Sequence, residues 1–313
     1  MGRYSITLKK TGPTCNPNNP CSGKYGKCLD IKIINTCNGN CPFCIEAKGF
    51  IPKDVSSAEK LAESVNGQNI NTLLILGGEP LLYPDIVKFV FLIRKDINII
   101  ITTNGSMLTP DLAKGLTPYV KGMNISIHHS TSAKHRELTK IDLNGDTLYK
   151  SVQAFGPDKI RINCNLVKGY VDSTKEINAM YDLTKRLGVT KIKFAELQNC
   201  PALFVDASTL FSNIPSEPFE KGCEITIPKK GMEVIVRVTC GIIDRNKPAV
   251  VEPSGRNAQT QIMYNDMQVV HGWLAENGIP VNSCHVRNNP NPPSSGGGSC
   301  SGGAIGRSLG SCS

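Results

Sequence analysis

The chain places a strand-length run and three cysteines within residues 29–44, which read LDIKIINTCNGNCPFC. Residues 29–34 are apolar enough for a buried strand, and Cys37, Cys41 and Cys44 follow in a loop that contains glycine and asparagine. Three thiolates at this spacing can bind one face of a cubane iron–sulfur cluster and leave the fourth iron without a protein ligand. An open iron of this kind can chelate a substrate or cofactor. A zinc loop is the alternative, since zinc knuckles have a similar density of cysteines.

Further apolar runs of strand length alternate with amphipathic segments. These runs are residues 72–76, 97–102, 122–127, 159–166 and 190–195. Most of them lack the alternation of a half-exposed strand, which favours a buried parallel sheet. Helices are predicted to begin near residue 57, after residues 83–85 and at residues 172–176, the last ending at Leu187-Gly188. The fold class is therefore α/β, with repeated βα units that close or partly close into a barrel.

The pattern changes from about residue 219. We expect a hairpin with strands over residues 224–227 and 234–239, joined by Pro228-Lys229-Lys230-Gly231. A helix is predicted over residues 258–277, with Gly278 as its end. Residues 288–313 are rich in Asn, Pro, Gly and Ser and are predicted to be disordered.

Composition narrows the class of protein. No run of 18 apolar residues occurs and the first ten residues lack the apolar stretch of a secretory signal, so we expect a soluble, cytoplasmic protein without a membrane span. The net charge of +9 is spread over short basic pairs, which gives only weak support to an anionic partner such as a nucleic acid. Thirteen cysteines in a long chain of this kind favour metal or cluster ligation over disulfides.

A second motif follows the second predicted strand and reads Gly77-Gly78-Glu79-Pro80. Two glycines let the backbone approach a ligand closely, and the Glu79 carboxylate can accept from an ammonium group. A plain βα turn is the alternative interpretation. In a parallel sheet this motif and the cysteine loop lie at the same edge, because both follow the carboxyl end of a strand.

Together the two motifs resemble the radical S-adenosylmethionine (SAM) superfamily, whose three cysteines have this spacing with an aromatic residue, here Phe43, before the last. The resemblance implies a 4Fe-4S cluster on the cysteine triplet, SAM bound to the open iron, and an electron donor of the flavodoxin or ferredoxin type. It also implies that the Gly77–Pro80 segment holds the methionine amino group of SAM. The chemistry implied is reductive cleavage of SAM to a 5'-deoxyadenosyl radical that abstracts hydrogen from a substrate. The fold implied is a partial (β/α)6 TIM-like barrel over residues 28–198.

Polar residues at further strand ends agree with the same layout. Thr103 and Asn104 resemble the superfamily's contacts near the ribose and methionine carboxylate, and Ser126 resembles its polar contact on the next strand. Asn163 and Asn165 alternate with apolar neighbours and so share a face that could line the barrel. Hydrogen bonding at strand ends is the alternative for these residues. His128 and His129 follow the same strand as Ser126, near the expected top of the barrel, where a substrate contact is one interpretation and a structural role, which we favour, is the other.

The chain divides into four predicted regions. These are a cysteine-containing segment at residues 1–27, the barrel at 28–198, a hairpin-plus-helix extension at 199–287 and the tail at 288–313. The nearest resemblance is to the branch of molybdenum-cofactor biosynthesis enzyme A and peptide-modifying enzymes, in which an auxiliary cluster follows the barrel. Cys223 and Cys240 flank the predicted hairpin and are the first candidate ligands for such a cluster. The further candidates are Cys200, Cys284, Cys15, Cys21 and Cys28. Zinc and unligated thiols are the alternatives, and Cys164 is predicted to be a core residue.

Three functions remain open from the sequence. The first is radical SAM modification of a peptide or protein, which the region after the barrel and the surplus cysteines favour. The second is radical SAM modification of a nucleotide, a nucleotide-derived metabolite or RNA, for which basic charge is the only support. The third is a non-catalytic iron–sulfur or zinc-binding module.

Overall fold

The computed structural model describes eight stretches of the chain, and these hold a ten-stranded sheet. The described residues are 28–44, 56–197, 200–211, 224–238, 261–267, 269–271, 273–274 and 280–281. The strand order in the sheet is β10-β9-β1-β2-β3-β4-β5-β6-β8-β7. The first six strands are β1 (Cys28–Lys32), β2 (Thr72–Leu76), β3 (Asn98–Thr103), β4 (Val120–Ser126), β5 (Ile160–Asn165) and β6 (Lys191–Ala195).

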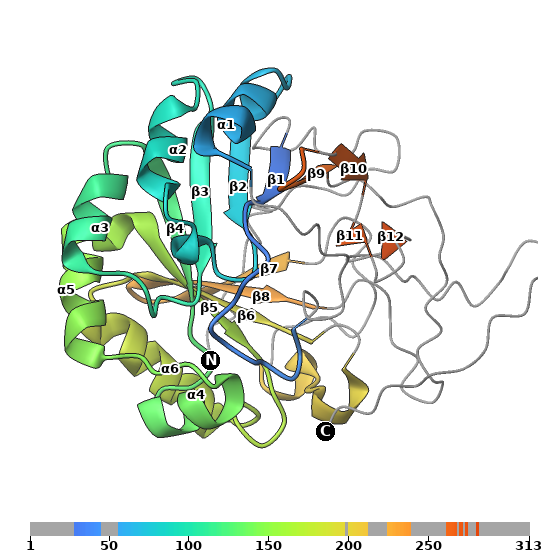
Figure 1. The fold of residues 1–313 in the computed structure, drawn as a ribbon. Coiled ribbons are helices and arrows are strands. Elements are labelled where there is room, and N and C mark those ends of the chain that lie inside the picture. Colours follow the sequence, from blue (N-terminus) through green and yellow to red (C-terminus); the bar gives the residue numbers. More distant parts are fainter. Residues whose placement is uncertain are drawn as a thin grey trace, which may run out of the picture.

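Helices cover the outer face of this sheet (Figure 1). They are α1 (Ala58–Asn66), α2 (Ile86–Leu92), α3 (Pro110–Leu116), α4 (Ser132–Thr139), α5 (Gly145–Phe155) and α6 (Thr174–Arg186). Short 3-10 turns lie at Pro80–Leu82, Pro157–Lys159, Pro201–Leu203 and Ala207–Thr209. The six predicted strands and the three predicted helix starts are confirmed, with strand ends shifted by at most two residues.

Strands β1 to β6 pair in parallel and in chain order, as repeated βα units require. Side chains on one face of each strand pack under the helices: Ile162 and Cys164 on β5, for example, are at most 1% exposed. Those on the other face, such as Asn163, are partly exposed. The period of two is weak in the sequence because both faces of a covered parallel strand are largely enclosed.

The sheet is curled. Asp30 on β1 is half-buried; desolvation raises its pKa to about 7, and the charge of Arg237 acts in the opposite direction. Arg237 ends β8 (Met232–Arg237), six strand steps from β1 in the sheet order. In a flat sheet six steps of about 4.8 Å would separate the strands by roughly 29 Å, too far for such an influence. The proximity therefore indicates that the sheet bends round toward a barrel, in agreement with the predicted partial barrel.

The predicted hairpin is confirmed. Strand β7 (Glu224–Lys229) pairs antiparallel with β8, and the turn is the two residues Lys230-Gly231, with Gly231 at φ +73°. Strand β8 also pairs in parallel with β6, so the hairpin extends the barrel sheet at that side.

The helix predicted over residues 258–277 is wrong where the structure describes that segment, because residues 261–264, 269–271 and 273–274 are strands. Strand β9 (Gln261–Tyr264) pairs in parallel with β1, and β10 (Val269–His271) returns antiparallel to β9. Two short strands, β11 (Trp273–Leu274) and β12 (Pro280–Val281), pair with each other. The open edge of β1 offers backbone hydrogen bonds that outweigh a moderate helical periodicity, and Met267 at φ +68° cannot sit inside a helix.

Local sequence explains where the helices begin. The Ser57 hydroxyl caps α1 by accepting from the Lys60 amide, and Ser173 caps α6 by accepting from the Glu176 amide. In α1 the residues buried against the sheet recur at helical spacing and include Leu61 and Val65. The serine hydroxyls therefore fix the starts of α1 and α6, and the apolar face of α1 packs against the strands.

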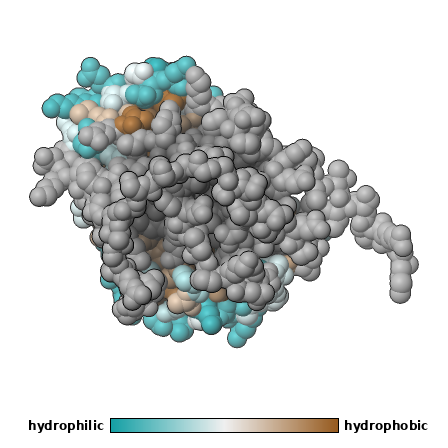
Figure 2. Space-filling view, turned by 90° about the vertical axis from the view of Figure 1, so that its right-hand side faces the viewer, coloured by the Kyte–Doolittle hydropathy of each residue, from teal (hydrophilic) through white to brown (hydrophobic). Residues whose placement is uncertain are grey.

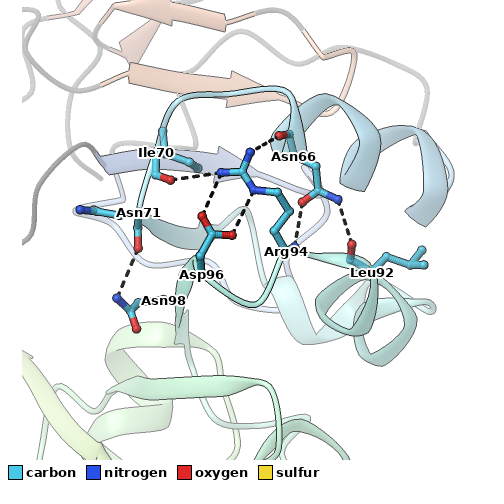
Figure 3. Close-up of polar contacts among 7 residues, drawn as sticks. All are labelled: Asn66, Ile70, Asn71, Leu92, Arg94, Asp96 and Asn98. Atoms are coloured by element: carbon cyan, nitrogen blue, oxygen red, sulfur yellow. Dashed lines mark hydrogen bonds and ion pairs between the residues drawn. The ribbon is translucent and has the colours of Figure 1, made fainter.

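A cluster of polar residues lies at the edge of the sheet where strands β2 and β3 begin (Figure 3). The Arg94 guanidinium donates to the Asn66 carbonyl at 2.6 Å and to the Asp96 carboxylate at 3.2 Å. The Asn66 side chain in turn accepts from the Arg94 amide and donates to the Leu92 carbonyl, both at 2.9 Å. This cluster satisfies the last backbone groups of α1 and α2 and leaves the other edge of the sheet to the polar residues described below.

In the part of the chain that the structure describes, no helix is both long and apolar enough to span a membrane. Among the described residues visible in Figure 2, most are hydrophilic and the apolar surface is confined to small areas.

Candidate active site

The cysteine loop leaves β1 at the carboxyl edge of the sheet and is held against the end of α4. The Asn40 amide donates to the Thr139 carbonyl at 2.8 Å, and the Cys44 amide donates to the Cys41 carbonyl at 3.0 Å. Gly39 lies so close to Ile141 that an added Cβ would stand 2.7 Å from that side chain. The loop is therefore fixed by backbone contacts and by one glycine that no larger residue can replace without movement.

The three thiols of the loop lie near one another. Burial raises the pKa of Cys41 to about 12, and the neighbouring Cys44 and Cys37 thiols raise it further. In the described stretches no three Cys, His, Asp or Glu side chains converge closely enough to hold a metal ion as they stand. The side chains of the triplet must therefore turn toward one point to bind a cluster, and the metal must displace their protons. Their sulfur chemistry and loop position fit a cluster that takes three protein ligands.

The two glycines of the second motif lie directly against the start of the cysteine loop. The Gly78 amide donates to the Ile34 carbonyl at 2.8 Å and the Glu79 amide donates to the Thr36 carbonyl at 2.9 Å. A Cβ on Gly77 would stand 2.5 Å from the Ile34 carbonyl oxygen. Only glycine allows this approach, so the motif does join the end of β2 to the cysteine loop, as its sequence position predicts.

The Glu79 side chain is 1% exposed and accepts three hydrogen bonds. One carboxylate oxygen accepts from the Thr103 hydroxyl at 2.6 Å and from the Leu81 amide at 2.9 Å. The other accepts from the Asn104 amide at 2.7 Å. Burial raises the pKa of Glu79, and the three donors act to lower it. Pro80, also buried, begins the 3-10 turn that presents the Leu81 amide.

These contacts give Glu79 a structural role that the sequence does not predict. A carboxylate has about four acceptor positions, and protein donors occupy three of them. Glu79 thus ties the ends of β2 and β3 together whether or not it also meets a ligand. Its predicted contact with an ammonium group stays a prediction.

Asn104 extends the same network to the cysteine loop. Its side-chain amide donates to the Asn38 side chain at 2.9 Å, and Asn38 donates to the Ser106 hydroxyl at 2.8 Å. Ser106 donates back to the Asn104 side-chain oxygen at 2.6 Å. Asn38 and Ser106 were not singled out from the sequence, although Asn38 lies inside the cysteine motif.

The remaining predicted polar residues share the inner face of neighbouring strands. Ser126 is in register with Asn163, and Asn165 is in register with Ala195 on β6. The Asn163 side-chain oxygen accepts from the Arg161 guanidinium at 3.0 Å. The structure thus brings these side chains to the interior face expected for them, where contact with a cofactor remains a prediction.

Two buried histidines support the cysteine loop from α4 and the end of β4. The rings of Phe43 and His128 meet edge-on, and the His135 ring stacks on His128 with centroids 6.2 Å apart. The His128 amide donates to His135 Nδ1 at 3.2 Å. Burial, reinforced by the neighbouring histidine, lowers the pKa of His128 to about 3. His128 is therefore a neutral structural residue, whereas His129 accepts from the Thr131 amide and is more exposed.

Cys28, a further candidate ligand, is the first residue of β1 and is half-buried. The other cysteines lie either in the core or outside the described residues. Cys164 is 1% exposed on β5, which confirms it as a core residue, and Cys200 is 4% exposed in a cluster with Leu138 and Val167. The proposed auxiliary ligands Cys223 and Cys240, and the tail at residues 288–313, lie outside the described residues. So do Cys15, Cys21 and Cys284.

Comparison with known proteins shows which family the region with these contacts belongs to. Residues 31–184 match the Radical SAM superfamily. This segment is a radical SAM domain. The family's cofactors are a 4Fe-4S cluster and SAM, and the cysteine triplet, the glycine motif and the Thr103-Asn104 turn all lie within the matched domain.

Curated relatives match over the same part of the chain. The GTP 3',8-cyclase of Alkaliphilus oremlandii is 33% identical over 187 residues, which cover 54% of this chain and 55% of the relative. The GTP 3',8-cyclase of Aliarcobacter butzleri is 29% identical over 178 residues, which cover 54% of each chain. The chain thus spans about half the length of the curated relatives that it matches.

Solved structures share the fold of this chain. SuiB of Streptococcus suis bound to S-adenosylmethionine has a TM-score of 0.54 at 15% identity and covers 78% of this chain and 59% of its own. SuiB bound to its precursor peptide SuiA has a TM-score of 0.53 at the same identity and coverage of this chain. At this identity the likeness concerns the fold, and it agrees with the partial barrel.

Proposed function

We propose that this protein is an enzyme that cleaves SAM reductively and abstracts hydrogen from a substrate. The observation that carries the proposal is the junction of three strand ends at one edge of the sheet. Backbone bonds join the glycine motif to the cysteine loop, and the Glu79 carboxylate joins the glycine motif to Thr103 and Asn104. A radical SAM domain needs these three segments in one place to hold a cluster and SAM together.

Each segment has a separate task in this proposal. Cys37, Cys41 and Cys44 hold the 4Fe-4S cluster, and Phe43 fixes their loop against His128. Gly77 and Gly78 hold the end of β2 against the start of the cysteine loop, which places this segment beside the methionine end of SAM, and Glu79 is positioned to accept from the ammonium group of SAM. Further cofactor contacts are proposed for Thr103, Asn104, Ser126, Asn163 and Asn165.

When bound, the cluster would supply the electron that cleaves SAM into methionine and a 5'-deoxyadenosyl radical, and this radical would take hydrogen from the substrate. The protein's own contribution is placement and exclusion of water. Thr103 and Glu79 are each 1% exposed, so the ends of β2 and β3 form a closed floor under the proposed site. An electron donor of the flavodoxin or ferredoxin type would supply the electron.

Anaerobic reconstitution tests the proposal. The full chain should take up iron and sulfide and release 5'-deoxyadenosine from SAM under a reductant such as dithionite. Replacing Cys37, Cys41 and Cys44 together by Ala should abolish both the cluster absorbance and 5'-deoxyadenosine formation. The matched control is Cys164→Ala, which removes a thiol from the β5 core and should leave both intact. Formation of 5'-deoxyadenosine by the triple variant would overturn the proposal, and iron uptake without SAM cleavage would favour a non-catalytic module.

For the substrate we propose a peptide or protein first, because the extension after the barrel and the surplus cysteines favour that class. The support is limited to the sequence, since Cys223 and Cys240 lie outside the described residues.

A second candidate is a nucleotide-derived small molecule. The curated relatives named GTP 3',8-cyclase favour it, as do the basic residues Arg161, Lys193 and Arg237 on the inner faces of β5, β6 and β8. The two classes separate in one assay: the true substrate class should raise 5'-deoxyadenosine formation above the rate seen with SAM alone.

A further inference from the structure

Three basic side chains belong to the interior faces of neighbouring strands β5, β6 and β8. Arg161 lies two residues before Asn163 on β5, and Asn163 is in register with Lys193 on β6. Lys193 is in register with Ile235 on β8, and Arg237 lies two residues beyond it on the same face. Because parallel strands in register point their side chains to the same side, Arg161, Lys193 and Arg237 face the barrel interior together.

These three cations lie within electrostatic reach of one another. Burial lowers the pKa of Lys193, the Glu224 carboxylate acts to raise it, and the charges of Arg237 and Arg161 lower it further. The side chain of Lys193 is only 13% exposed and forms an ion pair with Glu224 at the start of β7. Asp30, from the far side of the curled sheet, also feels the charge of Arg237.

Two acidic groups in the described part of the chain, Glu224 and Asp30, interact with this cluster of three cations. Burial acts to raise the pKa of Glu224, but the charges of Lys193, Arg237 and Arg161 together lower it below its usual value, so the carboxylate is negatively charged at neutral pH. Asp30, with a pKa of about 7, carries only part of one. Like charges held close together in an enclosed site repel one another, and a bound anion would offset that repulsion.

The position of these three basic residues in the barrel suits the binding of a substrate better than the binding of a structural ion. Asn165, Ala195 and Arg237 form one register row at the carboxyl ends of β5, β6 and β8, the same edge as the cysteine loop. Asn163 and Ser126 form the adjacent row. The basic group thus continues the polar inner wall toward the mouth of the barrel.

We propose that Arg161, Lys193 and Arg237 form a subsite for an oxyanion of the substrate, either a phosphate or a carboxylate. Guanidinium groups bind such oxyanions in a two-pronged geometry, and the ammonium group adds a point charge. The assignment to a substrate rests on the proposed function, whereas the binding of an oxyanion does not.

Calorimetric titration of the full chain, reconstituted and loaded with SAM, tests the subsite with two probes. One probe is inorganic pyrophosphate and the other is glutarate. Binding of pyrophosphate alone would assign the subsite to a phosphate, and binding of glutarate alone to a carboxylate. Lys193→Met should lower the affinity for the probe that binds by at least tenfold, and increasing salt should lower the affinity of the unaltered protein for that probe.

Two further variants make the result interpretable. Lys191→Met removes the same charge from the same strand, but the Lys191 ammonium donates to the Asp158 carbonyl at 2.9 Å at the opposite edge, so probe affinity should stay within twofold. The double variant Lys193→Met, Glu224→Gln removes both members of the ion pair and so avoids a lone buried carboxylate. Its affinity for the probe should still be at least tenfold lower than that of the unaltered protein.

The proposal is overturned if the unaltered protein binds neither probe, if the Lys193 variants bind as tightly as it does, or if Lys191→Met weakens binding equally. Formation of 5'-deoxyadenosine from SAM alone reports on the proposed function separately, because it needs no substrate anion.

Discussion

The ring of Phe43 meets the ring of His128 edge-on, with centroids 5.0 Å apart and planes at 82°. The same imidazole accepts from the Asn165 amide through Nδ1 at 3.0 Å. One buried side chain at the end of β4 therefore connects the cysteine loop to β5, which carries Asn163 and Arg161. Displacement of His128 would disturb the proposed cluster site and the proposed substrate wall together.

Acid should destabilise the fold through the buried histidines. Burial lowers the pKa of His128 to about 3 and of His135 to about 4, so both are neutral in the folded chain, whereas the unfolded chain binds protons below about pH 6.5. Their contribution is present above pH 6.5 and is lost as the pH falls toward 4. The expected loss is about 1.4 kcal/mol per pH unit for each histidine. Urea unfolding of the cluster-free chain at pH 7.5 and 5.0 measures it.

A glutamine variant identifies the source of this pH dependence. His135→Gln should reduce the difference in unfolding free energy between the two pH values by about half, whatever its cost at neutral pH. His129→Gln is the comparison variant: burial lowers the pKa of His129 as well, but at a more exposed position, so this change should reduce the difference by less than His135→Gln does. An unaltered pH dependence in His135→Gln would show that other groups cause the acid effect.

Removing the Glu79 side chain should weaken both the fold and SAM binding. Glu79→Ala leaves the Leu81 and Asn104 amides and the Thr103 hydroxyl without their acceptor, at a cost of about 1–3 kcal/mol for a buried polar group. Loss of the proposed ammonium contact should lower SAM affinity roughly ten- to hundredfold. Calorimetry with SAM and urea unfolding measure the two effects.

Glu63→Ala, which removes an exposed carboxylate from α1, is the control for Glu79→Ala and should change neither quantity. A Glu79→Ala protein with unchanged SAM affinity would limit Glu79 to its positioning role between β2 and β3.

Adding one methyl group at Gly78 should disrupt the junction of the glycine motif with the cysteine loop. The new Cβ would overlap the carbonyl oxygens of Thr36 and Asn35, which are backbone atoms and cannot turn away. Gly78→Ala should destabilise the chain by about 1–3 kcal/mol and abolish SAM binding. Gly145→Ala, at the start of α5 with no atom within 4 Å of the added Cβ, should be neutral or slightly stabilising. Equal thermal midpoints for the two variants would contradict the close approach.

The auxiliary cluster remains a prediction that iron content can decide. With Cys37, Cys41 and Cys44 replaced by Ala, the chain should still reconstitute with iron and give a distinct paramagnetic signal. Adding Cys223→Ala and Cys240→Ala should remove that signal. If the triplet variant binds no iron, the region after the barrel holds no second cluster, and the peptide hypothesis loses its main support.

The sequence predicts what depends on neighbouring residues and misses what depends on distant ones. Strand β2 and the start of α1 follow from an apolar run and a serine cap, so the sequence predicts both to within one residue. The segment of β9 carries a helical periodicity, and only the free edge of β1 makes it a strand. The partners of Glu79 and the gathering of Arg161, Lys193 and Arg237 arise from strand register and sheet curvature, which no local pattern encodes.

The pairing of β9 with β1 has a consequence for how the chain is made. Residues 29–32 lie beside residues 261–264, so one edge of the strand that leads into the cysteine loop has no partner until more than 200 further residues have left the ribosome. During synthesis that edge is exposed to other extended chains, as unpaired strand edges are. Iron–sulfur loading of the growing chain would therefore meet a cysteine loop whose strand β1 is paired with β2 alone, and the second partner of β1 comes only when β9 is translated.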